Sequence, residues 1–154
     1  MQQKSVFKSI LWVSLFILPF SLFAQVLSPE QFLGYKVGTR FTRHHQIVSY
    51  FTAIAAAKSD MVKLIPYGKT NEGRDLMVAA IGTPENIKNL EQIRKHNLGL
   101  VQGTVQDLNQ PGIVWMSYNV HGNETSSSEA ALLTVYAMVD PANAKTKEWL
   151  KNTV

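Results

Sequence analysis

The sequence predicts an α/β fold with a mixed, mostly parallel sheet, helices on both faces of the sheet and an incomplete C-terminal end. A nearly unbroken apolar run from Ile113 to Tyr118, opened by Pro111 and Gly112, predicts a central strand that is covered on both faces. Two further apolar stretches, Met61 to Pro66 and Asp75 to Ile81, are separated by turn-forming residues and predict a hairpin. Helical patterns lie between and after these strands, so a single mixed α/β unit is the simplest organisation.

Three further stretches complete this pattern. Phe41 to Lys58 places apolar residues at three- and four-residue spacing, which predicts an amphipathic helix. Thr83 and Pro84 are residue types that favour the cap and the first position of a second helix. Ala142 to Asn152 contains helix-forming residues, and Thr153 with Val154 has the character of a strand that is just beginning.

A short polar loop, Asn119 to Glu124, follows the predicted central strand. Ser126, with Glu129 three places later, forms a capping-box pattern that predicts a helix from about Ser127 to Val139. In open α/β sheets, ligands usually bind in the crevice at the C-terminal ends of the strands. This loop is therefore the candidate site of the domain.

The chemistry of the loop comes from an imidazole and a carboxylate, His121 and Glu124, separated by two residues. Both groups are good zinc ligands, and one turn of backbone can bring them to the same side. A third protein ligand and a water would then complete a catalytic site. The spacing alone favours a second interpretation, in which the histidine bonds to backbone and the glutamate faces the positive end of a helix.

The N-terminus has the layout of a secretory signal peptide. Lys4 and Lys8 precede an apolar run from Ile10 to Phe23, and Ala24 supplies a small residue for cleavage, so residues 1–24 are the predicted leader. The run is shorter than the roughly 20 residues that span a bilayer, so no stable membrane anchor is expected after cleavage. Residues 25–154 form the predicted domain, located outside the cytoplasm as a secreted or periplasmic protein.

Composition excludes several classes of protein. The chain has 154 residues and no cysteine, which removes disulfides and lipid-anchored cysteines. Its formal net charge is +4 with the basic residues scattered, so no nucleic-acid partner is predicted. The small basic cluster from Lys36 to Arg43 is interpreted as solvated surface. Residues 25–38 are expected to form an irregular lead-in, and no oligomeric state is predicted.

A wider set of motifs carries a family resemblance. The segment Tyr-Gly-Lys-Thr-Asn-Glu-Gly-Arg-Asp-Leu (Tyr67 to Leu76), followed by Asn-Val-His-Gly-Asn-Glu (Asn119 to Glu124), resembles the N-terminal half of a zinc carboxypeptidase of the carboxypeptidase A type. The upstream Arg-Phe-Thr-Arg-His-His (Arg40 to His45) is similar to secreted bacterial members of that family. Together these motifs cover most of the chain after the predicted leader, and the ordered set is far more specific than the His121–Glu124 pair alone.

The resemblance implies a function and a set of site residues. It implies one Zn²⁺ ion bound by His121 and Glu124 as the first two ligands, and peptide or protein C-termini as substrates from which terminal residues are released. The family's third ligand, its general-base glutamate and its carboxylate-binding arginine lie further downstream, beyond Val154, so no catalytic residue is assigned. Asn123 occupies a substrate-binding position where digestive members have arginine, which puts the substrate preference in doubt. The expected protein is thus a truncated metallocarboxypeptidase, inactive alone.

Two other functions remain open from the sequence. The first is a non-catalytic exported module that binds peptides in the same crevice, with affinity insensitive to chelator. The second is an exported α/β domain in which His121 and Glu124 are purely structural. A melting temperature that falls on addition of chelator would favour a metal site over both alternatives.

Overall fold

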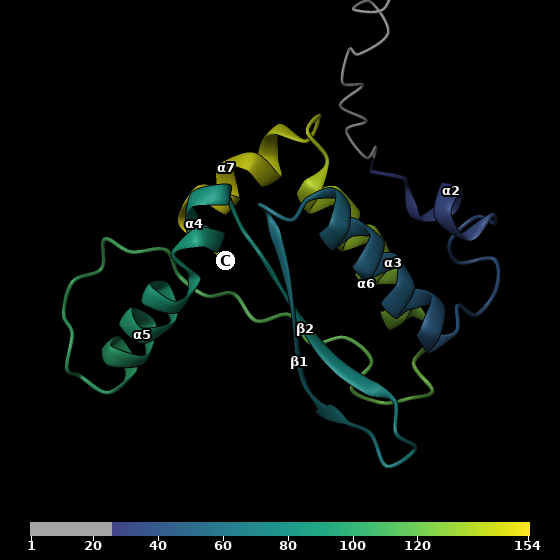
Figure 1. The fold of residues 1–154 in the computed structure, drawn as a ribbon, viewed down its shortest axis with the longest axis horizontal. Helices are drawn as coiled ribbons and strands as arrows, with labels where there is room; N and C mark the ends of the chain where they lie inside the picture. Colours follow the sequence, from purple (N-terminus) through teal and green to yellow (C-terminus); the bar gives the residue numbers. More distant parts are fainter. Residues whose placement is uncertain (1–25) are drawn as a thin grey trace, which may run out of the picture.

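The computed structural model describes residues 26–154, so the predicted signal peptide lies outside the described part. The described residues form six helices and one hairpin. In chain order the elements are α2 (Pro29–Leu33), α3 (His44–Ala57), β1 (Val62–Lys69), β2 (Asp75–Ile81), α4 (Pro84–Lys88), α5 (Leu90–Val101), α6 (Thr125–Val139) and α7 (Ala144–Asn152). The hairpin runs between α5 and the pair α3 and α6 (Figure 1). Within residues 26–154, none of the helices has the length and apolarity that crossing a membrane requires.

The hairpin predicted from the stretches at residues 61–66 and 75–81 is confirmed. β1 and β2 pair antiparallel from Val62 opposite Ile81 to Lys69 opposite Asp75, with one irregularity near Pro66. Gly73 adopts a φ of +76°, a conformation that side chains disfavour, and its N–H donates to the carbonyl of Thr70 over 2.9 Å. The turn-forming residues thus close the hairpin as expected.

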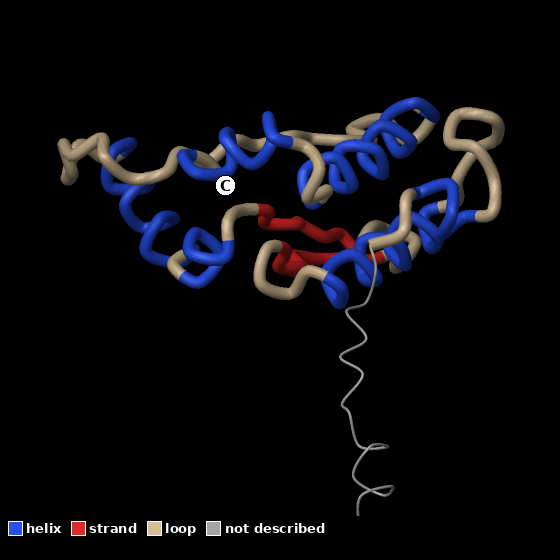
Figure 2. Tube along the Cα trace, turned by 90° about the horizontal axis from the view of Figure 1, so that it is seen from above, coloured by secondary structure: helices blue, strands red, loops and turns tan. Residues whose placement is uncertain are grey.

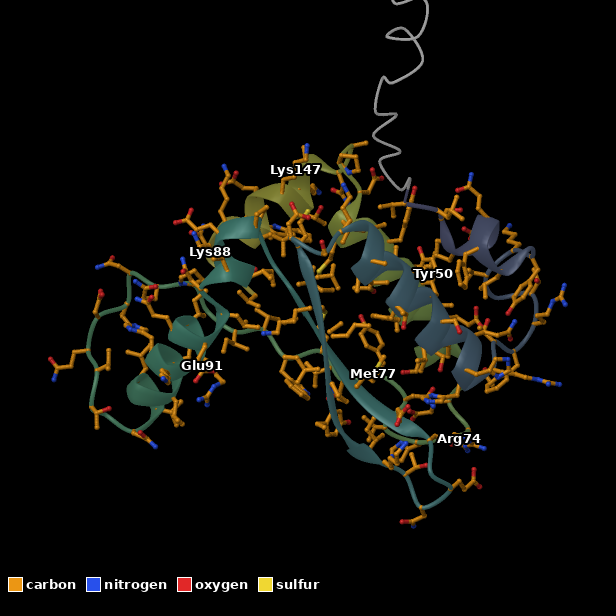
Figure 3. All side chains as sticks on the ribbon, in the orientation of Figure 1. Tyr50, Arg74, Met77, Lys88, Glu91 and Lys147 are labelled. Atoms are coloured by element: carbon orange, nitrogen blue, oxygen red, sulfur yellow. The ribbon has the colours of Figure 1, made fainter. Side chains whose placement is uncertain are left out.

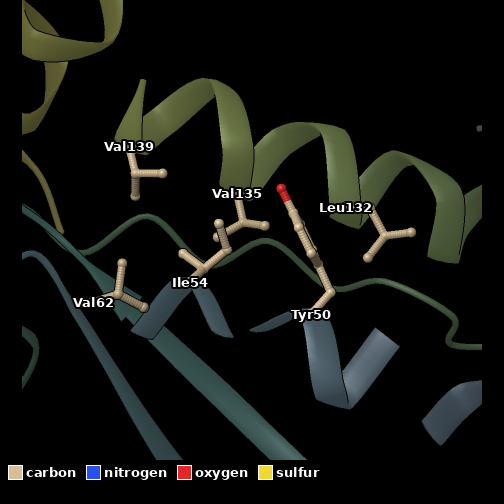
Figure 4. Packing of buried hydrophobic residues seen from close by; sticks show 6 residues of the cluster. All are labelled: Tyr50, Ile54, Val62, Leu132, Val135 and Val139. Atoms are coloured by element: carbon tan, nitrogen blue, oxygen red, sulfur yellow. The ribbon is translucent and has the colours of Figure 1, made fainter. Parts of the chain in front are cut away.

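The core lies between α3 and α6, at the start of β1. α3 packs against both α6 and β1, and the two helices run in the same direction (Figure 4). The fully buried members are Tyr50, Ile54, Val62, Leu132, Val135 and Val139. Tyr50, the largest of them, donates its hydroxyl to the carbonyl of Leu27 over 2.9 Å, so the segment before α2 is tied to the core.

The mostly parallel sheet is not present among the described residues, whose one sheet has two antiparallel strands (Figure 2). The predicted central strand, Ile113 to Tyr118, is exposed along its length and is not in a sheet. Its main-chain pairing is limited to a parallel contact in which the N–H of Val114 donates to the carbonyl of Val154 over 2.9 Å, beside a bridge between Gly112 and Thr153. A strand is buried on both faces only where neighbouring strands and helices enclose it, and residues 26–154 do not enclose this one.

Two local predictions were wrong at helix starts. α6 begins at Thr125 with Glu124 as its cap residue, and the predicted capping box between Ser126 and Glu129 does not form. The predicted irregular lead-in contains α2, which has a true capping box: the hydroxyl of Ser28 accepts from the N–H of Gln31, whose side chain accepts from the N–H of Ser28.

Candidate metal site

The candidate loop is anchored to the first two turns of α6. Asn119 has a φ of +58°, the one non-glycine residue with a positive φ in the described part of the chain. Its N–H donates to the hydroxyl oxygen of Ser127 over 2.6 Å, and the hydroxyl of Ser128 donates to its Oδ1 over 2.8 Å. Asparagine tolerates the left-handed conformation better than most side chains. These contacts fix the direction in which the loop leaves the extended run.

His121 and Glu124 lie at the two ends of a single turn. The N–H of Glu124 donates to the carbonyl of His121 over 3.1 Å, which closes the turn. The imidazole Nδ1 of His121 lies 2.9 Å from Oε1 of Glu124, and the two side chains are 70% and 48% exposed. The structure therefore brings the two predicted ligands together at the surface, and their role as ligands stays a prediction.

The pair can be compared with the geometry that zinc requires. Two ligand atoms about 2.0–2.1 Å from a tetrahedral zinc lie about 3.3 Å apart, slightly more than the 2.9 Å between Nδ1 and Oε1. A small side-chain rotation, which their exposure permits, would open the pair enough to admit the ion. An imidazole nitrogen with a carboxylate oxygen is also a donor set that zinc accepts. The chemistry and spacing of the pair are thus compatible with two corners of a zinc site.

The third corner is missing from residues 26–154. No group of three or more histidine, cysteine, aspartate or glutamate side chains in this part of the chain is placed to hold a metal ion. The other histidines lie elsewhere: His44 and His45 begin α3, and His96 on α5 contacts the carbonyl of Asp107 over 2.7 Å. Within residues 26–154, no third such side chain therefore joins His121 and Glu124.

Asn123, the predicted substrate-binding residue, occupies the turn between the two predicted ligands. It is exposed, and none of the hydrogen bonds within residues 26–154 uses its side-chain amide. The amide is therefore available to a molecule bound at the loop, while its function stays a prediction.

Glu129 is a residue whose role the sequence analysis misassigned. It is 8% exposed, and its carboxylate accepts from the N–H of Thr42 over 2.9 Å and from the N–H of Gly38 over 3.2 Å. It thereby joins the segment before α3 to the first turns of α6. Glu129 lies three residues before Leu132 and so on the same, buried face of the helix. Because a buried carboxylate needs hydrogen-bond partners, this position could have predicted a contact inside the protein.

Comparison with known proteins gives one match. Searches of curated proteins and of solved structures found no similar protein. A protein-family model, described as zinc carboxypeptidase, matches residues 47–154. The matched region contains the hairpin, the turn with His121 and Glu124, and α6, and it spans more than half of the sequence. The chain therefore belongs to the zinc carboxypeptidase family.

Proposed function

We propose that this chain contributes His121 and Glu124 as two zinc ligands of a metallocarboxypeptidase that releases C-terminal residues from peptides. The observation that carries the proposal is the 2.9 Å approach of Nδ1 to Oε1 in an exposed turn at the start of α6. The family match supports the same reaction class. A zinc ion bound there would polarise the scissile carbonyl and make a bound water acidic.

The residues around the pair have supporting roles in this proposal. Asn119 and its two serine partners set the position of the turn, because two hydrogen bonds to one helix restrain the backbone just before it. Asn123 offers a neutral amide to the substrate, whereas a cationic residue at that position would pair with a substrate carboxylate. The amide is compatible with a broad range of peptides or with a modified amino acid near the C-terminus.

Catalysis requires more than the described residues supply. With two ligands, zinc would keep several waters and be poorly oriented, and no general base is assigned. We infer that activity depends on further residues that provide the third ligand and the base. The 154-residue chain alone is expected to release no C-terminal residues in the presence of zinc, as judged by chromatography of a peptide substrate.

Export of the protein is part of the same proposal, because Lys4, Lys8 and the apolar run that follows them have the composition of a signal peptide. Sequencing the N-terminus of the protein recovered outside the cytoplasm tests it. A start at Gln25 is expected, and retention of the full chain in the cytoplasm would contradict export.

Calorimetric titration with zinc tests the metal site. We expect weak binding of one ion by the folded chain, and a reduction of at least about tenfold in affinity for His121→Ala or Glu124→Gln. Loss of a residue that merely orients a ligand already costs about 10–100-fold in metal sites, so loss of a ligand should cost no less. His45→Gln is the matched control, since it removes an exposed histidine on α3. Equal affinity in all four proteins would refute the proposed ligands.

The non-catalytic peptide-binding module is the second candidate, and the absence of a three-group cluster in residues 26–154 favours it. It differs from the metallocarboxypeptidase in its response to chelator. Peptide affinity at the His121 loop that is unchanged by removal of zinc, together with no zinc binding in calorimetry, would support the module.

A further inference from the structure

The segment between α2 and α3 concentrates positive charge. No aspartate or glutamate occurs between Glu30 and Asp60, whereas Lys36, Arg40 and Arg43 lie within eight positions. These three side chains are exposed, as are the two histidines that follow them. None of the ion pairs within residues 26–154 involves any of them. Within the described part of the chain, these cations are therefore not held in ion pairs.

An open hollow lies within this basic segment, with a volume of about 330 Å³. Two arginines and two aromatic residues lie together in its lining, which consists of Tyr35, Arg40, Phe41, Arg43, His45 and Gln46. The guanidinium carbon of Arg40 lies 4.1 Å from the centre of the Tyr35 ring, a cation–π distance that holds the charge over the aromatic surface. Phe41 is 53% exposed. The hollow thus offers both charge and apolar surface to a ligand.

The frame behind the hollow is fixed by buried contacts. Thr42 is fully buried; its N–H donates to Glu129, and its hydroxyl lies 2.8 Å from the hydroxyl of Tyr35. Gly38 is held by the same carboxylate. The backbone on either side of Arg40 and Phe41 is therefore restrained by Glu129 of α6, and the contact between Thr42 and Tyr35 restrains it further. This restraint lowers the entropic cost of binding a ligand.

The electrostatic surroundings favour an anion. α3 begins at His44 and has no acidic residue in its first turn, so its positive N-terminal end adds to the charge of the arginines. Two carboxylates lie near the segment, and neither forms an ion pair with its arginines. Glu129 is buried and accepts hydrogen bonds from two backbone N–H groups. Oδ1 of Asp75 lies 2.6 Å from Nζ of Lys69. The hydrogen bond from Lys69 is the main cause of the lowered pKa of Asp75, to which the nearby His44 also contributes.

The hollow and the candidate metal site lie at the same end of the helix pair. α3 and α6 run in the same direction, and Glu129, five residues after Glu124, contacts the backbone directly before α3 (Figures 1 and 4). A bound peptide with its C-terminus at the His121 turn can therefore extend toward the basic segment. We propose that the hollow binds acidic side chains of the peptide substrate, upstream of its C-terminal residue. The identity of the peptide as substrate rests on the proposed function.

Binding of synthetic peptides in the presence of EDTA tests this assignment without the metal site. The probes are a ten-residue peptide containing four glutamates and its counterpart with four glutamines, each carrying an uncharged fluorophore for anisotropy. At low salt we expect the glutamate peptide to bind at least about tenfold more tightly, since charge-assisted hydrogen bonds to arginine are the stronger kind. The difference should shrink as salt is raised to about 0.5 M, because exposed charges are screened.

Arginine variants locate the binding surface. Arg40→Gln and Arg43→Gln together should remove most of the preference for glutamate. Arg94→Gln is the control: Arg94 is on α5, paired with Glu91, and Figure 3 shows Glu91 on the arm opposite the helix that carries Tyr50. An unchanged preference in the double variant, or equal loss in the control, would overturn the assignment.

Measurements on the wild-type protein alone can also overturn the proposed binding of acidic side chains. Equal binding of the two peptides at low salt would exclude recognition of acidic side chains. Inorganic phosphate, or vesicles of phosphatidylserine, competing at lower concentrations than the glutamate peptide would identify a general anion or membrane surface instead. Because EDTA is present throughout, failure here leaves the zinc titration unaffected, and failure of the zinc titration leaves this result unaffected.

Discussion

Leu132→Ala is expected to destabilise the protein by about 3–5 kcal/mol, the range for deletion of a fully buried leucine side chain. Leu132 has no exposed surface and lies in the cluster between α3 and α6, where it neighbours Tyr50 (Figure 4). Removal of three carbon atoms leaves a cavity that the aromatic ring and the two helix backbones cannot close. Urea denaturation followed by circular dichroism measures the change in the free energy of unfolding.

The adjacent residue provides the control. Leu133 is 46% exposed and lies roughly 100° further round the same helix. Leu133→Ala should therefore cost less than about 1 kcal/mol. The two substitutions have the same change in composition and nearly the same helix position, which isolates burial as the cause. Equal effects of the two would contradict the described packing of α6.

Glu129→Ala is expected to cost about 2–4 kcal/mol, because the buried N–H of Thr42 and the partly buried N–H of Gly38 lose their acceptor. The N–H of Thr42 belongs to a residue with no exposed surface, so water cannot readily replace the carboxylate there. The segment before α3 should also loosen, which faster amide hydrogen exchange at Gly38 and Thr42 would report.

Two control variants distinguish the loss of the buried hydrogen bonds of Glu129 from the loss of a negative charge alone. Glu148→Ala removes an exposed glutamate that pairs with Lys151, and a change within about 0.5 kcal/mol is expected. Glu129→Gln keeps one oxygen acceptor of similar size and should retain part of the stability. If Glu129→Ala were no more harmful than Glu148→Ala, the proposed link between α6 and the segment before α3 would be wrong.

Elements set by local residue patterns could be predicted from the sequence. The turn formers between β1 and β2 and the positive φ of Gly73 follow from short-range geometry. The cap at Thr83 and the start of α4 at Pro84 are local in the same way, and the helix over residues 41–58 is confirmed as α3. In each case the information lies within a few residues of the element itself.

Elements set by distant partners could not be predicted. Ile113 to Tyr118 has the composition of a buried strand, but a strand needs neighbours, and residues 26–154 give it only a short contact with residues 152–154. Glu129 fits the local pattern of a capping box, yet the backbone N–H groups of Thr42 and Gly38, roughly 90 residues away, take its carboxylate. Tertiary hydrogen bonds to buried groups outweigh the weaker local preference.

The candidate site also has one part that could be predicted from the sequence and one part that could not. The proximity of His121 and Glu124 follows from their spacing, because a single turn joins them. The left-handed backbone of Asn119 and its serine partners depend on how the loop meets α6, which the residue pattern does not encode. No third donor beside the pair occurs within residues 26–154, so the spacing of His121 and Glu124 could not show how a metal site would be completed.

The most direct test of the central claim, that His121 and Glu124 bind zinc together, is a zinc titration followed by NMR of the histidine ring nitrogens. The chain has four histidines, so each ring can be assigned by a single substitution. We predict that zinc shifts the Nδ1 resonance of His121 first, and that Glu124→Gln weakens this response. A response confined to His44, His45 or His96, or none at His121 at millimolar zinc, would contradict the account.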